Sequence, residues 1–308
     1  MKLRWTSIAW SIMYLLLLLS LKDMSLGIVT VLFLVLPATL LYSTLNLKMF
    51  LLHIIPIWLL AFMNDRASIL LAVYFIIPSL VMGHCYKRKA SALRTLVTGT
   101  LAILAEMLLI LLIGTIFFQF DLSFYVEEII RMTLAPLQDA GTNNRLMSDM
   151  VMVWTNDDMI NLSNMTMRMI PFAMIICAFM MAVVTHSLAR PILNTLGFSV
   201  PKLKPAREWM LPRSLIWYYF IGVIIEFFAR GSHNYFLILI ASNLVPLLHI
   251  FFMVQAIGFF FYLAHTRKWH PILPILMVVV ILLIPPMRIV GILDLAFPLR
   301  QMMTKSKR

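Results

Sequence analysis

Long apolar runs separated by short polar links repeat along the whole chain. Each run is close to the roughly 20 residues that a helix needs to cross the hydrocarbon core of a bilayer. The runs are continuous in Leu, Ile, Met and Phe, unlike the alternating strands of a membrane barrel, so helices are predicted. The nine runs cover residues 5–21, 24–45, 48–63, 67–86, 95–118, 168–188, 214–230, 234–264 and 271–293. The pattern predicts an all-α fold, a polytopic transmembrane helical bundle of eight or nine helices.

The composition agrees with a membrane protein and excludes soluble classes. Hydrophobic residues make up 62% of the 308 residues and charged residues 12%, whereas soluble domains carry about 25% charged residues. The net charge is +12, but the basic residues lie in short loops and form no continuous basic face, which argues against nucleic-acid binding. The lipid bilayer is the main expected partner.

The charges of the loops predict which side of the membrane each loop faces. The link 87–94 carries four basic residues and no acid, and 189–213 carries five basic residues against Glu208. Segment 119–164 instead carries seven acids against two arginines. Because cytoplasmic loops are enriched in Lys and Arg, the sequence predicts a multi-pass protein of the bacterial cytoplasmic membrane with its N-terminus in the cytoplasm.

This orientation divides the chain into three parts. They are five transmembrane helices in 1–118, an acidic extracytoplasmic loop with amphipathic helices in 119–164, and three or four spans with a short basic tail in 165–308. Within the loop, Phe120 to Leu134 has apolar residues near helical spacing, which predicts an amphipathic helix on the outer surface. We expect a break at 139–144 and a second short helix over 145–159.

The last apolar run has two possible topologies. Nine full crossings would leave the basic tail outside, although segments rich in Lys and Arg are expected on the cytoplasmic side. Pro285 and Pro286 interrupt the run after Ile284, so residues 272–284 could instead enter the membrane and turn back, with their backbone shielded by protein. The second topology returns the tail to the cytoplasm.

Glu106 stands near the centre of the fifth run. A central acid costs about 2.5 to 3.5 kcal/mol on the insertion scale, and the surrounding apolar residues more than offset it. Gly99, Ala102 and Glu106 share one helical face, and small residues allow another helix to pack closely, so Glu106 should point into the bundle. It is either a binding or proton-linked carboxylate or a protonated acid bonded to a neighbouring helix.

Further polar candidates lie in the last three runs. Glu226 precedes Arg230 by four residues, the favourable order for an ion pair within one helix, and the pair could form a polar opening with residues 232–234. The eighth run contains Asn243, Pro246, His249 and Gln255. Proline frees a backbone carbonyl at membrane depth, and such interrupted helices often line cavities in transporters.

The final run adds one charged pair. Arg288 follows the two prolines, and Asp294 lies six residues later. A charge at membrane depth requires a partner. We expect the two residues to pair with each other or with Glu106.

No motif of an enzyme, a metal site or a cofactor site is visible. The sequence contains no HExxH, CxxC, Walker-type phosphate loop or GxSxG, and its seven histidines lack metal-ligand spacing. Its 24 methionines are spread along the chain and suit apolar packing better than copper binding. We expect no enzymatic activity, no catalytic residue, no metal and no cofactor.

The C-terminal third resembles the YybS-like family of bacterial multi-pass membrane proteins. The resemblance is carried by Leu211-Pro212, by Asn243, Gln255 and Gly258, by Arg267-Lys268, and by a Gly-x-x-Asp-x-x-Phe-x-x-Arg string from Gly291 to Arg300. This family is distantly similar to the substrate-binding S components of energy-coupling-factor transporters. The resemblance implies a helical bundle that captures a small solute and passes it inward with a partner module.

Two functions from different classes remain open. The first is a transporter or transporter subunit that binds a small solute in a midplane cavity. A cytoplasmic ATPase or coupling subunit is the expected partner at 189–213. The residues expected to bind the solute are Glu106, Asn243, His249 and Gln255, with Glu226 and Arg230 at the outer opening. The second is a membrane scaffold or assembly protein that binds a partner through its outer loop.

Overall fold

The computed structural model describes residues 5–303 except 23, 65, 144–155, 233, 298, 301 and 302. All regular secondary structure in this part of the chain is helical. The all-α prediction is therefore confirmed, and each of the nine apolar runs lies in one or more helices.

The first five runs form six helices. The fourth run is divided at Phe75 into two helices, because Pro78 has no N–H group to bond to the carbonyl oxygen of Tyr74. The helices are α1 (Trp5–Ser20), α2 (Met24–Thr44), α3 (Leu47–Asn64), α4 (Arg66–Tyr74), α5 (Ile76–Lys87) and α6 (Ala92–Phe118).

The remaining runs form longer helices and one interrupted segment. The elements are α7 (Leu122–Asn143), α9 (Asn156–Thr195), the 3-10 turn η1 (Ala206–Glu208), α10 (Leu215–Arg230), α11 (Tyr235–Thr266), α12 (Ile272–Leu283), the 3-10 turn η2 (Pro285–Met287) and α13 (Arg288–Ala296). The two prolines divide the last run after Leu283, close to the interruption after Ile284 that the sequence predicted.

Several helices are long and apolar enough to cross a membrane. Five spans meet this standard in the described residues: Leu47–Asn64, Ile69–Lys87, Ala92–Phe118, Asp157–Thr195 and Tyr235–Thr266. The bent pair α12 and α13 makes a sixth candidate, and α1 and the apolar part of α2 are shorter. Large hydrophobic side chains such as Leu108, Phe227 and Leu283 are exposed, as expected for surfaces that face lipid.

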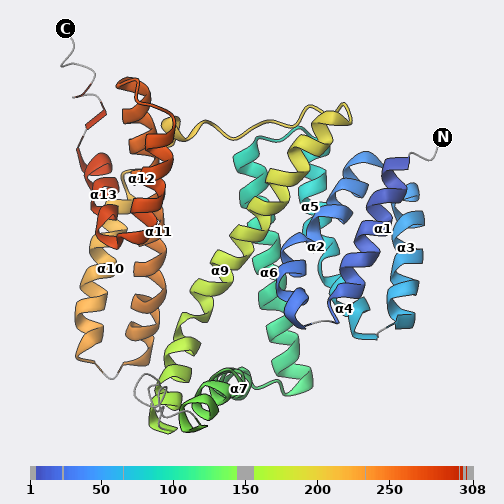
Figure 1. The fold of residues 1–308 in the computed structure, drawn as a ribbon, viewed down its shortest axis with the longest axis horizontal. Coiled ribbons are helices and arrows are strands. Elements are labelled where there is room, and N and C mark those ends of the chain that lie inside the picture. The colour runs from blue at the N-terminus through green and yellow to red at the C-terminus, as the bar shows by residue number, and fades with distance from the viewer. Residues whose placement is uncertain are drawn as a thin grey trace. The chain divides into compact units, whose positions relative to one another are not determined.

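The chain forms two compact units. Unit 1 comprises residues 1–120 and 173–203, and unit 2 comprises residues 121–172 and 204–308. Within unit 1, α2 packs against α1 and α5, and α5 packs against α6. Within unit 2, α11 packs against α10, α12 and α13 (Figure 1). Each unit is described separately below.

The core of unit 1 is built on apolar side chains and two close helix contacts. Tyr14, Phe50 and Met82 are among its fully buried large residues. Gly83 lies against Tyr42 of α2, and Gly99 of α6 lies against Met82 of α5. Because glycine has no side chain, these helices approach more closely than bulkier residues would allow.

Unit 2 has a smaller core between α11 and α13. Leu248, Phe252 and Leu295 form its buried centre. A Cβ atom added at Gly291 would clash with the carbonyl oxygen of Phe252, so α13 lies directly on the backbone of α11. Gly258 lies against the carbonyl oxygens of residues 206 and 209, which packs η1 onto α11.

The last apolar run turns back. The axes of its two helical parts are bent by 116° at the break after Leu283. The Tyr262 hydroxyl donates to the carbonyl oxygen of Arg300, and Arg300 Nη1 donates to that of Arg207. These bonds place the end of α13 at the end of unit 2 where α11 finishes and α12 begins. This hairpin geometry agrees with the second predicted topology, in which the last run enters the membrane and turns back.

The segment after α6 differs in part from its prediction. The helix expected over Phe120 to Leu134 is present as α7, but α7 continues to Asn143, through most of the expected break at 139–144. Helical backbone bonding there overrides the local preference of Gly141 and Asn143 for turns. Most of the second helix expected at 145–159 lies outside the described residues, and α9 begins at Asn156.

Candidate functional site

Unit 2 contains a pocket of about 470 Å³ where α10, α11 and the first part of α9 meet. Its volume falls in the range of small-molecule sites, which is roughly 300 to 1,000 Å³. Charged and polar side chains line it beside small apolar ones. The lining residues are Arg168, Glu226, Ala229, Arg230, Ser232, Ile238, Ala241, Ser242, Val245, Pro246 and His249.

The pocket extends from the α10–α11 turn into the helical part of unit 2. Ser232 belongs to that turn, and His249 lies 14 residues after the first residue of α11. At 1.5 Å per residue, this is about 21 Å along the helix axis. Pro246 lies in the wall and leaves the carbonyl group of Ser242 without its usual helical donor. The pocket therefore includes both the polar opening predicted at Glu226 and Arg230 and the interruption of the helix predicted at Pro246.

The predicted ion pair between Glu226 and Arg230 is confirmed. Arg230 Nη2 lies 2.8 Å from Glu226 Oε1. The Arg230 side chain is 77% exposed and that of Glu226 is 33% exposed, so solvent weakens the pair. The pair leaves Glu226 with its charge already compensated.

Arg168 contributes a second positive charge to the pocket. Its guanidinium carbon lies 5.9 Å from the centre of the Tyr235 ring, within the range of a cation–π contact. Its Nε atom is buried and has no hydrogen-bond partner among the described residues. A buried donor of this kind costs free energy unless a partner is supplied, so Arg168 is a candidate to bind a hydrogen-bond acceptor.

Asn243 holds the backbone that carries Arg168. Its Nδ2 donates to the carbonyl oxygen of Arg168 and its Oδ1 accepts from the amide of Phe172, both at 2.7 Å. In an α-helix these two backbone groups would bond to each other. The side-chain amide of Asn243 therefore takes the place of this backbone hydrogen bond of α9, next to Pro171. Asn243, predicted to bind solute, thus joins α11 to α9 beside the pocket.

His249 connects α10 and α11 inside the pocket. Its Nε2 atom lies 3.4 Å from the Tyr219 hydroxyl, a long hydrogen bond. Glu226 and Arg288 are both within electrostatic range of the ring. His249 is one of three predicted site residues, with Glu226 and Arg230, that the structure places in this pocket.

Gln255 lies outside the pocket, in a buried network. Its Oε1 accepts from the amide of Leu211 at 2.9 Å, and its Nε2 donates to Asp294 Oδ2 at 2.6 Å. Arg300 donates to the same carboxylate from Nη2 at 2.8 Å. The expectation that Asp294 pairs with Arg288 or Glu106 is therefore wrong, because Arg300 is brought onto it by the turn at Phe297. The Gly-x-x-Asp-x-x-Phe-x-x-Arg string fixes the re-entrant hairpin.

Glu106 belongs to unit 1. Its side chain is 6% exposed, which confirms that it points into the helical bundle. Neither carboxyl oxygen has a hydrogen-bond partner among the described residues, while Tyr74 lies within electrostatic range of it. The other five predicted site residues lie in unit 2, so a chamber shared by Glu106 and His249 stays a prediction.

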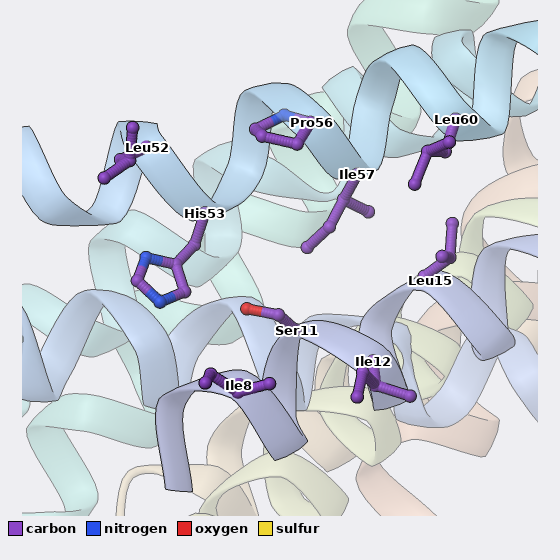
Figure 2. A pocket seen from close by; sticks show the side chains of 9 residues that line it. All are labelled: Ile8, Ser11, Ile12, Leu15, Leu52, His53, Pro56, Ile57 and Leu60. Atoms are coloured by element: carbon purple, nitrogen blue, oxygen red, sulfur yellow. The ribbon is translucent and has the colours of Figure 1, made fainter. Parts of the chain in front are cut away.

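A second hollow in unit 1 has different chemistry. It has a volume of about 320 Å³ and lies between α1 and α3 (Figure 2). Ser11 and His53 are its polar side chains, and each bonds to a carbonyl of its own helix, at Ser7 and Met49. The remaining wall is apolar, which suits a lipid chain better than a polar solute.

The sequence analysis missed Arg168 because it stands at the start of an apolar run, where a basic residue usually marks the membrane boundary. Pro171 three residues later was the available signal of an irregular helix. In the part of the chain that the structure describes, no group of three or more His, Cys, Asp or Glu side chains could hold a metal ion.

Comparisons with known proteins place this chain in a family. The family model described as "Predicted membrane protein (DUF2232)" matches residues 11–295. "Uncharacterized protein YybS" of Bacillus subtilis (strain 168) is 26% identical over 136 residues, which are 42% of this chain and 43% of that protein. The aligned part is thus less than half of that relative's length, and no solved structure matches the chain. Because the family model covers most of the chain, this multi-pass membrane protein belongs to the YybS-like DUF2232 family of predicted membrane proteins.

Proposed function

We propose that this protein is a small-solute-binding subunit of a transporter in the bacterial cytoplasmic membrane, and that the pocket of unit 2 is its binding site. The observation that carries the proposal is the convergence of Arg168, Glu226, Arg230 and His249 on one pocket beside Pro246. A few charged and polar groups that converge on a concave site with an otherwise apolar wall are typical of small-molecule sites.

The position of the pocket supports solute capture from outside. The pocket lies at the end of unit 2 that holds the α10–α11 turn. The basic residues Arg207, Arg267 and Lys268 lie at the opposite end, where Arg207 contacts His265. Because Lys and Arg are enriched on the cytoplasmic side, that basic end should face the cytoplasm and the pocket should face outward. The basic link 87–94 separately supports a cytoplasmic N-terminus.

Two further parts of the proposal concern energy and partners. Glu106 is a buried carboxyl group suited to accompany an ion or a proton during transport. The basic segment 189–213 is the proposed cytoplasmic docking segment for an ATPase or coupling subunit, because the resemblance to the S components of energy-coupling-factor transporters implies a partner module. Neither role involves an enzymatic site on this chain.

Filling the pocket tests the proposal. Ala241 lines the pocket and is buried, so Ala241→Trp places an indole ring in the cavity. The matched control is Ala105→Trp, at an exposed position of α6. Purified protein in nanodiscs is equilibrated with a small-molecule extract of the expressing cells, and retained molecules are identified by mass spectrometry.

The wild type and Ala105→Trp should retain the same compound, and Ala241→Trp should lose it. Equal retention by all three proteins, with all three monodisperse in size-exclusion chromatography, would remove the pocket as the binding site. The scaffold alternative is separated by deleting residues 122–160. A transporter subunit keeps its bound compound after the deletion, whereas a scaffold loses its protein partner.

A further inference from the structure

Positively charged side chains outnumber negatively charged ones around the pocket. Arg168 and Arg230 line it, and Glu226 is the acid of the lining. Glu226 is already paired with Arg230, so the charge of Arg168 has no counterpart in the pocket wall. Arg288, within electrostatic range of His249, adds to the positive side. The electrostatic field in the pocket therefore favours a negative group.

The neutral polar groups of the wall already have partners. Ser242 Oγ donates to the carbonyl oxygen of Ile238 at 2.8 Å, and Ser232 Oγ accepts from the amide of Asn234 at 2.9 Å. The guanidinium of Arg168 is different, because its Nε atom is buried and lacks a partner among the described residues. Apart from two acceptors, the Ser242 carbonyl and the Glu226 carboxylate that is paired with Arg230, the pocket offers a solute the cationic donor group of Arg168.

The position of Arg168 is fixed on two sides. Asn243 bonds to its carbonyl oxygen, and the Tyr235 ring lies against its guanidinium. A planar guanidinium held in this way suits the two oxygens of a carboxylate, which it can bind through parallel hydrogen bonds. The rest of the wall, at Ala241, Val245 and Pro246, is apolar.

We infer that the pocket of unit 2 selects a small organic anion, whose carboxylate is bound by Arg168 and whose apolar body lies along Ala241, Val245 and Pro246. This inference rests on the proposed function and names the class of its solute. Arg168 is then the residue that determines specificity, and Asn243 is a residue that positions it.

Three probes with one ring and different charge test the inference. Benzoate is the anion, benzamide the neutral analogue and benzylamine the cation. Their binding to the purified protein in phosphatidylcholine nanodiscs is measured by saturation-transfer NMR and titration. Benzoate should bind more tightly than benzamide, and benzylamine should bind most weakly.

Arg168→Gln should weaken benzoate binding about tenfold or more, as expected for the loss of charge-assisted hydrogen bonds, and leave benzamide binding unchanged. The matched control is Arg131→Gln, which makes the same change on the exposed surface of α7, where Arg131 pairs with Glu127. This control should bind benzoate as the wild type does. Asn243→Leu should weaken benzoate binding because Arg168 loses its backbone support.

The outcomes separate this inference from the proposed function. If benzamide or benzylamine binds as tightly as benzoate and Ala241→Trp abolishes that binding, the pocket is a solute site but the anion inference is wrong. If no probe binds, or if Arg168→Gln has no effect on benzoate binding, the anion inference is also overturned. The proposed function is then tested separately, by whether the purified protein retains a compound from the cell extract. If phosphatidylglycerol in the nanodisc displaces benzoate from the wild type, the anion that Arg168 binds is a lipid headgroup and the solute form of the inference fails.

Discussion

Replacing Asp294 by Asn removes the centre of the network that fixes the re-entrant hairpin. The Asp294 side chain is fully buried, and that of Arg300 is 13% exposed. The carboxylate accepts hydrogen bonds from Arg300 Nε and Nη2 and from Gln255 Nε2. An amide at this position keeps one acceptor oxygen, but its NH₂ group faces donors and the charge of Arg300 is left without a counterion.

The size of the effect follows from the burial of the pair. Removing one partner of a buried ion pair costs about 3 to 5 kcal/mol, because the other charge stays desolvated. One kcal/mol shifts the melting temperature of a soluble domain of 150 to 250 residues by roughly 2 to 4 °C, so a unit of this size should lose about 6 to 20 °C. Arg300→Gln should cost a similar amount by leaving the carboxylate unpaired.

The assay is thermal unfolding in detergent, followed by size-exclusion chromatography of the remaining monodisperse protein. Asp294→Asn, Arg300→Gln and the double variant form a thermodynamic cycle. The double variant should lose less than the sum of the two single losses, since neither charge is then left alone. Arg131→Gln is the control, because its exposed pair with Glu127 should contribute only about 0 to 1 kcal/mol.

A melting temperature of Asp294→Asn within about 2 °C of the wild type would refute this reasoning, because it corresponds to at most about 1 kcal/mol. Strictly additive losses in the cycle would also contradict it. In either case Gln255 and Arg300 would not depend on the carboxylate, and the packing of Gly291 on α11 alone would hold the hairpin.

Three further predictions concern the same unit and Glu106. Gly291→Ala should lower the melting temperature by more than Gly231→Ala, because its new methyl group clashes with a backbone oxygen of α11 while Gly231 has open space. Because the hairpin returns the tail to the basic, cytoplasmic side, a fluorescent protein fused to the C-terminus should fluoresce and alkaline phosphatase fused there should be inactive. Fusions after Ser232 should give the opposite result, and active phosphatase at the C-terminus would rule out that topology. Glu106→Leu should leave the melting temperature unchanged or raise it, because removing a buried polar group without a partner is nearly neutral or stabilising, and a fall of more than about 5 °C would indicate a partner.

The hydrophobic pattern was sufficient to locate the helices. Every apolar run is helical because a backbone surrounded by lipid must satisfy its hydrogen bonds within its own segment, which is a local requirement. The ion pair between Glu226 and Arg230 is local in the same sense, since four residues bring two side chains together on one helix. The buried position of Glu106 followed from its small-residue face.

Other features depend on contacts between segments far apart in the chain. Loop charge left the direction of the last run open, and the bonds from Arg300 to residues 207 and 294 determine it. Gln255 and Asn243 were both expected to bind solute, as polar residues at membrane depth often do. Whether such an amide faces a cavity or bonds to another helix depends on what packs against it, which the sequence does not encode locally.

The sequence by itself therefore determined the class of protein, the positions of its helices and the ion pair between Glu226 and Arg230, because bilayer thickness and helical geometry act within one segment. Only the tertiary structure decided that the final run turns back and that Arg168 joins Glu226, Arg230 and His249 around a pocket. The physical reason is that a hydrogen bond or a cavity between helices depends on distances across the bundle, and spacing along the chain does not fix those distances.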